Sequence, residues 1–197
     1  MLKAGIVGAA GYAGAELVRI LLRHPDFGLR VITSNSDAGV ALSEVYPAFA
    51  GLTDLSFSRH DDPALFECDV VFLATPHTVA MKSAPALLAS GVTVIDLSAD
   101  YRLRDRATYE KWYGVEHTSP DLLADAAFGQ PELERAGLLA AASRRLSGEA
   151  VLVACAGCYP TATSLAAAPV IALSEGIVVA DAISGVSGAG RSATART

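Results

Sequence analysis

One cysteine stands where its thiol could act as a nucleophile. Cys158 follows Gly157 at a tight turn between an apolar run, 150–154, and a predicted helix that begins near Pro160. A thiol at a helix N-terminus faces unpaired backbone N–H groups and the positive end of the helix dipole, a setting that favours the thiolate. Proline suits the first helical turn because no N–H donor is needed there. The same pattern also fits a small buried residue at a strand end, so the local sequence leaves both interpretations open.

A glycine-rich turn near the N-terminus has the context of a nucleotide-binding loop. The apolar strand predicted for residues 3–7 runs into three glycines spaced G-x-x-G-x-x-G, and a helical pattern follows over residues 15–23. Glycines let the backbone approach a pyrophosphate, whose charge the helix N-terminus attracts. A plain tight turn is the alternative, but the flanking strand and helix favour nucleotide binding. The predicted cofactor-binding residues of this turn are Gly8, Gly11, Tyr12 and Gly14.

The end of the second predicted strand, 29–33, indicates which nucleotide would bind. NAD-preferring sites usually have Asp or Glu there, holding the ribose 2′-hydroxyl. Here the strand runs into Ser34, Asn35 and Ser36, and the carboxylate of Asp37 is displaced further along the chain. Hydroxyl and amide groups can bind a 2′-phosphate, which a carboxylate would repel. Ser34 and Ser36 are therefore predicted to bind the cofactor, and NADP(H) is the predicted cofactor.

Three other segments place polar residues after predicted strands. Arg102 closes the run 96–102 at a strand end, where ligands bind in open α/β sheets, and its guanidinium could hold a carboxylate or phosphate. A surface salt bridge is its alternative role. His77 also follows a strand, and we favour capping of the next helix as its role. The glycine-serine loop 184–191, after a strand predicted for 177–180, could present N–H groups to an anion or serve as a flexible linker.

Composition and charge limit the class of protein. The chain has 197 residues, of which 52% are hydrophobic, enough for one domain with a sizeable core and part of a second. The formal net charge of −6 argues against a nucleic-acid partner, and no apolar run has the length of a membrane span. Three cysteines and no signal peptide lead us to expect a cytoplasmic protein. No metal site is predicted.

The alternation of strands and helices predicts the fold. Strands at 69–74 and 92–97 flank a helix predicted over 79–90, which is typical of a doubly wound parallel sheet. The following region is more irregular and more charged, apart from a helix predicted over 138–146. We expect an α/β Rossmann domain over residues 1–148 and, over residues 149–197, the beginning of an α+β catalytic and dimerisation domain that is apparently truncated.

Five motifs occur together in an order that is far more specific than any one of them. They are GAAGYAGAEL at 8–17, DLSADYR at 96–102, FGQPEL at 128–133, GCYPTA at 157–162 and SGVSGAGR at 184–191. With these motifs the chain resembles the N-acetyl-gamma-glutamyl-phosphate reductases, within the superfamily of acyl-phosphate reductases and semialdehyde dehydrogenases. The resemblance extends over nearly the whole chain.

The resemblance implies a reaction of arginine biosynthesis in which NADPH reduces an acyl phosphate to an aldehyde. Cys158 would attack the acyl carbon of N-acetyl-gamma-glutamyl phosphate, expel phosphate and form a thioester, which hydride transfer converts to the semialdehyde. The resemblance also implies that Ser187 and Gly188 lie near the nicotinamide and that Arg102 lies on the substrate side. A homo-oligomer is expected for the full-length protein.

The chain departs from the family pattern in two places. Cys155 and Ala156 replace an Asn-Pro or Val-Pro pair, which creates a C-x-x-C with Cys158, and we hypothesise that Cys155 could trap Cys158 as an oxidative off-switch. The family's catalytic domain also continues past residue 191 and supplies a histidine for acid–base catalysis. We therefore expect the 197-residue chain alone to be a poor catalyst. The histidines of this chain, none of which lies in that motif, are His24, His60, His77 and His117.

Three alternative functions stay open on the sequence. One is an aminoadipyl-phosphate or aspartyl-phosphate reductase of the same superfamily, which would differ in substrate-side residues. Another is a truncated, non-catalytic remnant that binds a nucleotide. The third is a thiol oxidoreductase that uses the C-x-x-C, although no thioredoxin-like pattern surrounds it.

Overall fold

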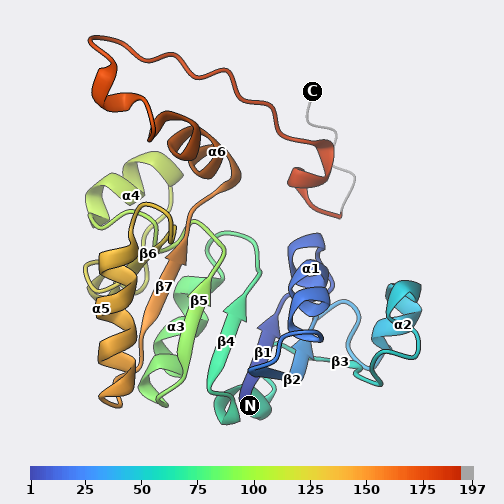
Figure 1. Cartoon of the computed structure of the whole chain (residues 1–197). Helices are drawn as coiled ribbons and strands as arrows, with labels where there is room; N and C mark the ends of the chain where they lie inside the picture. Colours follow the sequence, from blue (N-terminus) through green and yellow to red (C-terminus); the bar gives the residue numbers. More distant parts are fainter. Residues whose placement is uncertain (192–197) are drawn as a thin grey trace.

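A seven-stranded parallel sheet, in the order β3-β2-β1-β4-β5-β7-β6, organises the computed structural model, which describes residues 1–191 (Figure 1). The strands are β1 (Leu2–Val7), β2 (Phe27–Thr33), β3 (Phe57–Ser58), β4 (Val70–Leu73), β5 (Thr93–Asp96), β6 (Ala127–Gly129) and β7 (Leu152–Cys155). The α-helices are α1 (Tyr12–Leu21), α2 (Leu42–Val45), α3 (Ala80–Ala89), α4 (Arg106–Tyr113), α5 (Arg135–Leu146) and α6 (Cys158–Ala167). Short 3-10 helices are η1 (Pro47–Phe49), η2 (Pro63–Glu67), η3 (Pro120–Leu122), η4 (Ile171–Leu173) and η5 (Val186–Ala189).

Apolar side chains are buried on both faces of the sheet, because successive residues of a strand point in opposite directions. In β4, Val71 and Leu73 pack into one apolar cluster, whereas Val70 and Phe72 pack into the other. The first cluster includes side chains of α3, and the second includes side chains of α1. The predicted doubly wound α/β sheet is therefore confirmed.

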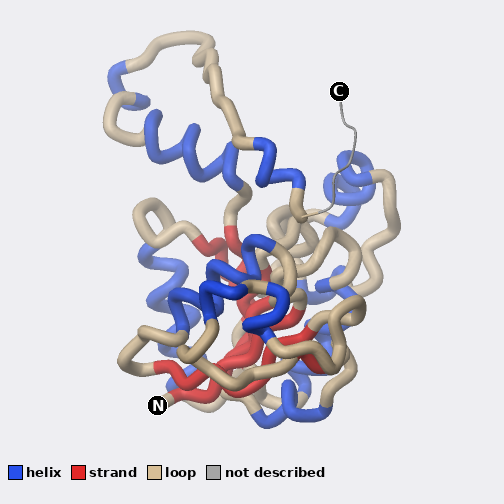
Figure 2. The backbone as a smooth tube through the Cα atoms, turned by 90° about the vertical axis from the view of Figure 1, so that its right-hand side faces the viewer, coloured by secondary structure: helices blue, strands red, loops and turns tan. Residues whose placement is uncertain are grey.

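The strand order changes direction between β1 and β4, the kind of switch point at which open α/β sheets bind ligands. The turn of residues 8–11 follows β1, and α6 begins just beyond the end of β7. Figure 2 shows α6 standing clear of the sheet. Residues 168–191 then pass above the carboxyl ends of the strands toward α1 (Figure 1). The segments that carry the candidate residues thus all lie on the side of the sheet where the strands have their carboxyl ends.

Two short segments differ from the sequence prediction. The strand predicted for 177–180 is wrong: this segment is irregular, and Ile177 and Val179 are almost fully exposed. Branched apolar residues form a strand only where an edge is available for pairing, and no strand of residues 1–191 pairs with this one. Conversely, β6 is too short to show an alternating pattern in the sequence, and it forms because β7 offers its outer edge.

The helix boundaries differ little from the prediction. The helix expected near Pro160 begins at Cys158, and the helix expected over 138–146 begins at Arg135.

No helix within residues 1–191 combines the length and the apolar character needed to cross a lipid bilayer.

Candidate functional site

The three glycines of the turn after β1 have three different structural roles. Gly8 has a φ of +86°, and a Cβ there would lie 2.5 Å from the carbonyl oxygen of Ala74, so the turn itself requires glycine. A Cβ on Gly14 would overlap the Gly8 carbonyl and lie 2.5 Å from Ala9 Cα, so this glycine lets α1 pack closely against the turn. A Cβ on Gly11 would meet only the Gly8 oxygen, at 3.5 Å.

This arrangement fits the pyrophosphate of a dinucleotide. Gly11 is the N-cap of α1 and its neighbour Tyr12 begins the helix, where no side chain accepts from the N-terminal N–H groups. Those N–H groups and the open space over Gly11 leave room for a phosphate to approach the backbone. Gly8, Gly11 and Gly14 thus match the turn, approach and packing roles of a dinucleotide-binding loop. Tyr12 is 47% exposed at the first turn, where it can contact a bound nucleotide.

The end of β2 carries a small polar cluster. The hydroxyls of Ser34 and Ser36 donate hydrogen bonds to the Asp37 carboxylate, at 2.7 and 2.6 Å. Arg191 adds a guanidinium, whose Nη2 lies 3.3 Å from Asp37 Oδ1 and whose Nη1 lies 3.2 Å from the carbonyl oxygen of Ala10. Hydrogen bonds from Ser36 and Ser34 lower the pKa of Asp37, so this carboxyl is ionised at neutral pH.

Asp37 is therefore closer to the predicted serines than the sequence suggests, and a cation compensates its charge. Arg191 was not predicted to lie at this end of the site. The available signal was that Arg191 is the only cation of the segment 184–191. Contact across 154 residues of sequence could not be read from local spacing.

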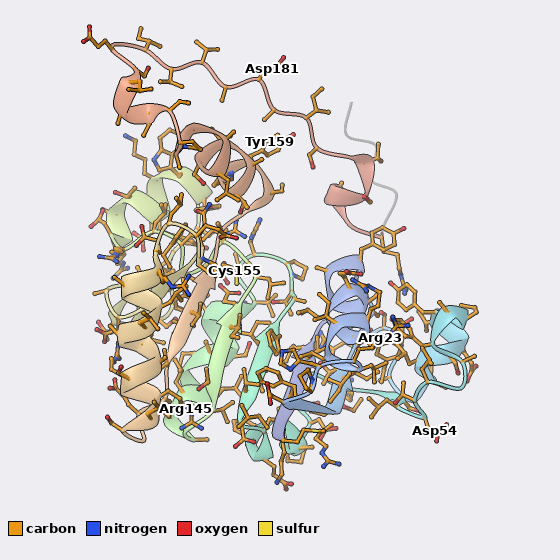
Figure 3. All side chains as sticks on the ribbon, in the orientation of Figure 1. Arg23, Asp54, Arg145, Cys155, Tyr159 and Asp181 are labelled. Carbon is orange, nitrogen blue, oxygen red and sulfur yellow. The ribbon has the colours of Figure 1, made fainter. Side chains whose placement is uncertain are left out.

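Cys158 is the exposed member of the three cysteines. It is the first residue of α6, Gly157 is the N-cap, and no side chain caps this helix end. Its Sγ lies 4.0 Å from the hydroxyl oxygen of Ser184. Cys155 is half-buried and Cys68 is buried, and burial raises the pKa of both thiols. Figure 3 shows Cys155 at the end of β7, with Tyr159 on α6 above it and Asp181 on the extended segment beyond.

A cavity of about 710 Å³ opens beside Cys158. One wall is a face of α6 that includes Thr163 and Ala166, and the other is the segment 178–185. This volume lies within the range of small-molecule sites. The candidate nucleophile therefore borders a space large enough for a small acyl substrate.

The side chain of Arg102 packs against the turn that leads from β7 to Cys158. Its Nε donates to the carbonyl oxygen of Cys155 at 2.7 Å, and its Nη2 donates to the carbonyl oxygen of Leu97 at 2.8 Å. The remaining nitrogen, Nη1, lies against Gly157. Two of the three guanidinium nitrogens thus bind backbone at the ends of β5 and β7.

The rest of the motif 96–102 holds the strand ends together. The buried carboxylate of Asp100 accepts hydrogen bonds from the amides of Thr78 and Met81 at the start of α3, at 2.8 and 3.1 Å. It thereby stabilises the N-terminus of α3 and the left-handed backbone of Thr78, whose φ is +72°. His77 Nδ1 accepts from the amide of Ala99 at 3.0 Å, so His77 joins two loops instead of capping α3 with its side chain.

Asp96 is a second buried carboxyl of this motif. Its oxygens accept from the amide and the hydroxyl of Ser98, at 2.8 and 2.9 Å. Burial nevertheless raises the pKa of Asp96 to about 6, because these two hydrogen bonds only partly offset the desolvation of its charge.

The motif 128–133 anchors α6. The buried side chain of Gln130 donates from Nε2 to the hydroxyl of Ser164 at 2.6 Å, and Ser164 in turn donates to the carbonyl oxygen of Pro160. No role was predicted for Gln130 from the sequence. Its position directly after β6, beside the strand that leads to Cys158, was the feature that could have indicated one.

The loop 184–191 extends between the two ends of the candidate site. Ser184 lies at Cys158, Arg191 lies at Asp37, and Ser187 and Gly188 lie between them in η5. All four histidines make hydrogen bonds to groups other than Cys158. His24 accepts from the amide of Asp26, His60 pairs with Thr33, His77 accepts from the amide of Ala99, and His117 pairs with the carbonyl oxygen of Asp100.

Family models and known proteins match the chain over nearly its full length. The model for "Semialdehyde dehydrogenase, NAD binding domain" matches residues 3–141, and the model for "Semialdehyde dehydrogenase, dimerisation domain" matches residues 158–197. The first match establishes a domain for a nicotinamide cofactor, and the second points to self-association. Residues 192–197, at the end of the second match, lie outside the described residues.

Two similar curated relatives have the same name. N-acetyl-gamma-glutamyl-phosphate reductase of Halorhodospira halophila is 49% identical over 100% of this chain and 56% of its own length. That of Herminiimonas arsenicoxydans is 48% identical over 98% of this chain and 54% of its own length. The chain thus spans about half the length of the curated relatives it matches.

Solved structures agree on the fold. Aspartate semialdehyde dehydrogenase with NADP from Candida albicans superposes with a TM-score of 0.64 at 18% identity, covering 88% of this chain and 47% of the other. Aspartate semialdehyde dehydrogenase II complexed with ASA from Vibrio cholerae superposes with a TM-score of 0.60 at 14% identity, covering 87% of this chain and 47% of the other. The sheet, the glycine turn and both family models lead to one conclusion: the chain belongs to the semialdehyde dehydrogenase family.

Proposed function

We propose that this chain is part of an NADPH-dependent reductase that converts N-acetyl-gamma-glutamyl phosphate to N-acetylglutamate 5-semialdehyde and phosphate, in arginine biosynthesis. The observation that carries the proposal is the position of Cys158, which is exposed at the first position of α6 beside a cavity of about 710 Å³. The name shared by curated relatives at 48–49% identity supports the substrate.

Cys158 is the proposed nucleophile. Its sulfur attacks the acyl carbon, the C–O bond to phosphate breaks, and a thioester forms on the protein. The free N–H groups at the start of α6 can stabilise the oxyanion that develops during this attack. A nicotinamide cofactor bound at the glycine turn would supply the hydride needed to take the thioester to the aldehyde, with the Cys158 thiolate as the leaving group. Arg102 remains the substrate-side candidate, and Nη1 is the nitrogen through which it could contact a phosphate or carboxylate.

NADP(H) is the proposed form of the cofactor. Gly8, Gly11, Tyr12 and Gly14 would hold its pyrophosphate, and the cluster after β2 would receive its 2′-phosphate. Ser34 and Ser36 supply hydroxyls there, and the Arg191 guanidinium offsets the charge of Asp37. Ser187 and Gly188 are proposed to lie along the cofactor toward the nicotinamide.

The remaining expectations follow from the same assignment. We propose a homo-oligomeric, cytoplasmic enzyme whose partners are small molecules rather than nucleic acid or membranes. The division between its two domains is best placed between β7 and α6, because β7 belongs to the first sheet and the matched regions are 3–141 and 158–197. The boundary expected after residue 148 would instead assign β7 to the second domain.

The test is a reductase assay of the full-length protein with three acyl phosphates: acetylglutamyl, aminoadipyl and aspartyl. We expect NADPH oxidation with the first, and its loss in Cys158→Ser but not in Cys68→Ser. Turnover only with another acyl phosphate would change the substrate assignment. Cofactor binding without any turnover would support a nucleotide-binding remnant instead.

A further inference from the structure

Arg102 bridges β5 and β7 just past the last pair of residues that joins the two strands. Asp96 and Ala154 are the last paired residues, and Leu97 and Cys155 follow them. The guanidinium of Arg102 binds the carbonyl oxygens of these two following residues, at 2.8 and 2.7 Å. The side chain therefore fixes the strand end from which the turn to Cys158 departs.

Gly157 shows how closely Arg102 supports this turn. Its φ of −76° and ψ of 167° are accessible to any residue, so backbone conformation does not require glycine. A Cβ at this position would instead lie 2.9 Å from Arg102 Nη1 and 3.4 Å from Arg102 Cζ. Because two hydrogen bonds hold the guanidinium in place, it cannot move away without losing one of them. The space taken by Arg102 is thus the reason for glycine immediately before the cysteine.

We propose that Arg102 is a positioning residue, which sets the orientation of Cys158 by clamping the ends of β5 and β7 and supporting Gly157 from below. The planar guanidinium supplies donors in two directions at once, which a lysine ammonium on a flexible chain does not reproduce. This inference rests on the proposed role of Cys158 as the nucleophile. It assigns Arg102 an action through the turn, in addition to any contact that Nη1 makes with a substrate.

A double-mutant cycle between Arg102 and Gly157 tests whether the two residues act together on Cys158. The rate of Cys158 alkylation by iodoacetamide, followed by peptide mass spectrometry in the full-length protein, reports on the turn without requiring reductase activity. We expect Gly157→Ala to slow alkylation about tenfold, the effect of losing one charge-assisted hydrogen bond. In an Arg102→Ala background, where the methyl group has space, the same change should cost less than about twofold. Arg104→Ala, an exposed arginine two residues away, is the matched control.

A lysine variant separates clamping from charge. Arg102→Lys should behave like Arg102→Ala in alkylation and should lower kcat more than it raises KM for the acyl phosphate. If Arg102→Ala fails to fold, as judged by circular dichroism, Arg102→Gln takes its place in the cycle. If Gly157→Ala slowed alkylation of Cys158 equally with and without Arg102, the clamp would be wrong. An Arg102→Lys protein with the wild-type alkylation rate would also contradict it. If the protein has no reductase activity but Arg102 and Gly157 still affect the alkylation rate of Cys158 jointly, only the proposed function is contradicted.

Discussion

Arg191 and Asp37 lie 154 residues apart in sequence, yet their side chains meet at the end of β2, with Arg191 Nη2 3.3 Å from Asp37 Oδ1. The contact joins the glycine-serine loop to the place where a Rossmann fold selects between its two nicotinamide cofactors. An unpaired carboxylate there would favour NAD by repelling a 2′-phosphate. The pair with Arg191 changes that expectation, because the cation offsets the repulsion.

Arg191→Gln should therefore weaken NADPH binding more than NADH binding. We expect about a tenfold loss of affinity for NADPH, the effect of removing one charge-assisted interaction, and a much smaller loss for NADH. Fluorescence titration with each cofactor measures both. Arg59→Gln is the control, since Arg59 pairs with Asp61 on the exposed surface. Equal losses for the two cofactors would contradict a role of Arg191 in selecting NADP.

Two glycines of the same turn should fail in different ways. Gly11→Ala places its methyl group in ordinary contact at 3.5 Å, so the variant should fold normally and lose cofactor affinity. Gly14→Ala forces its methyl group against the backbone of Gly8 and Ala9, which should lower the free energy of unfolding by about 1–3 kcal/mol. Urea unfolding and NADPH titration of both variants separate these outcomes. A Gly11→Ala protein with unchanged affinity would argue that the pyrophosphate does not approach this turn.

The stability of the protein should depend on pH through Asp96. Its pKa is raised from 3.8 to about 6 in the folded state, so the folded state binds the proton more tightly than the unfolded state does. The contribution of this group is therefore present below about pH 4 and lost as pH rises toward 6, by about 3 kcal/mol. Asp96→Asn lacks this loss, so the unfolding free energy of the variant relative to wild type should rise across that interval.

Urea unfolding at several pH values measures this difference directly. Asp61→Asn, at an exposed position, serves as the control. A constant difference between Asp96→Asn and wild type from pH 4 to pH 7 would mean that burial does not perturb this carboxyl as described.

Alkylation should distinguish the three cysteines by their exposure. Cys158 is exposed, whereas burial raises the pKa of the Cys155 and Cys68 thiols, so iodoacetamide at neutral pH should modify Cys158 first. Peptide mass spectrometry over time gives the order. A reductase assay of the full-length protein tests the oxidative off-switch: after mild peroxide, Cys155→Ser should fail to recover activity with dithiothreitol if wild type recovers through a Cys155–Cys158 disulfide. Equal behaviour of the two proteins would exclude that disulfide as the switch.

The layers of the fold could be predicted because each element carries its own signal. The strand, glycine turn and helix at the N-terminus are contiguous, and the apolar runs of β4 and β5 have the composition of strands buried on both faces. β6 and the segment 177–180 could not be predicted in the same way. Whether a few β-prone residues form a strand depends on a free edge, which is a property of the assembled sheet.

The candidate site divides along the same line. Cys158 and the three glycines were identifiable because chemistry and local geometry coincide in a few consecutive residues. The contacts of Arg102 with Cys155, of Gln130 with Ser164 and of Arg191 with Asp37 join distant segments, and nothing in local spacing encodes them. The sequence indicated that Arg102 mattered, but only the structure reveals that two of its nitrogens bind carbonyl oxygens at strand ends.

The position of β7 has a consequence for how the chain is made. β7 follows both β5 and β6 in sequence but lies between them in the sheet, and β6 pairs with β7. During synthesis β6 therefore leaves the ribosome before its partner exists, and the edge of β5 stays open until β7 inserts. The turn to Cys158 begins where β7 ends, so the thiol reaches its position in the same step that closes this part of the sheet. The order of assembly thus couples the placement of the Cys158 thiol to the closing of this sheet.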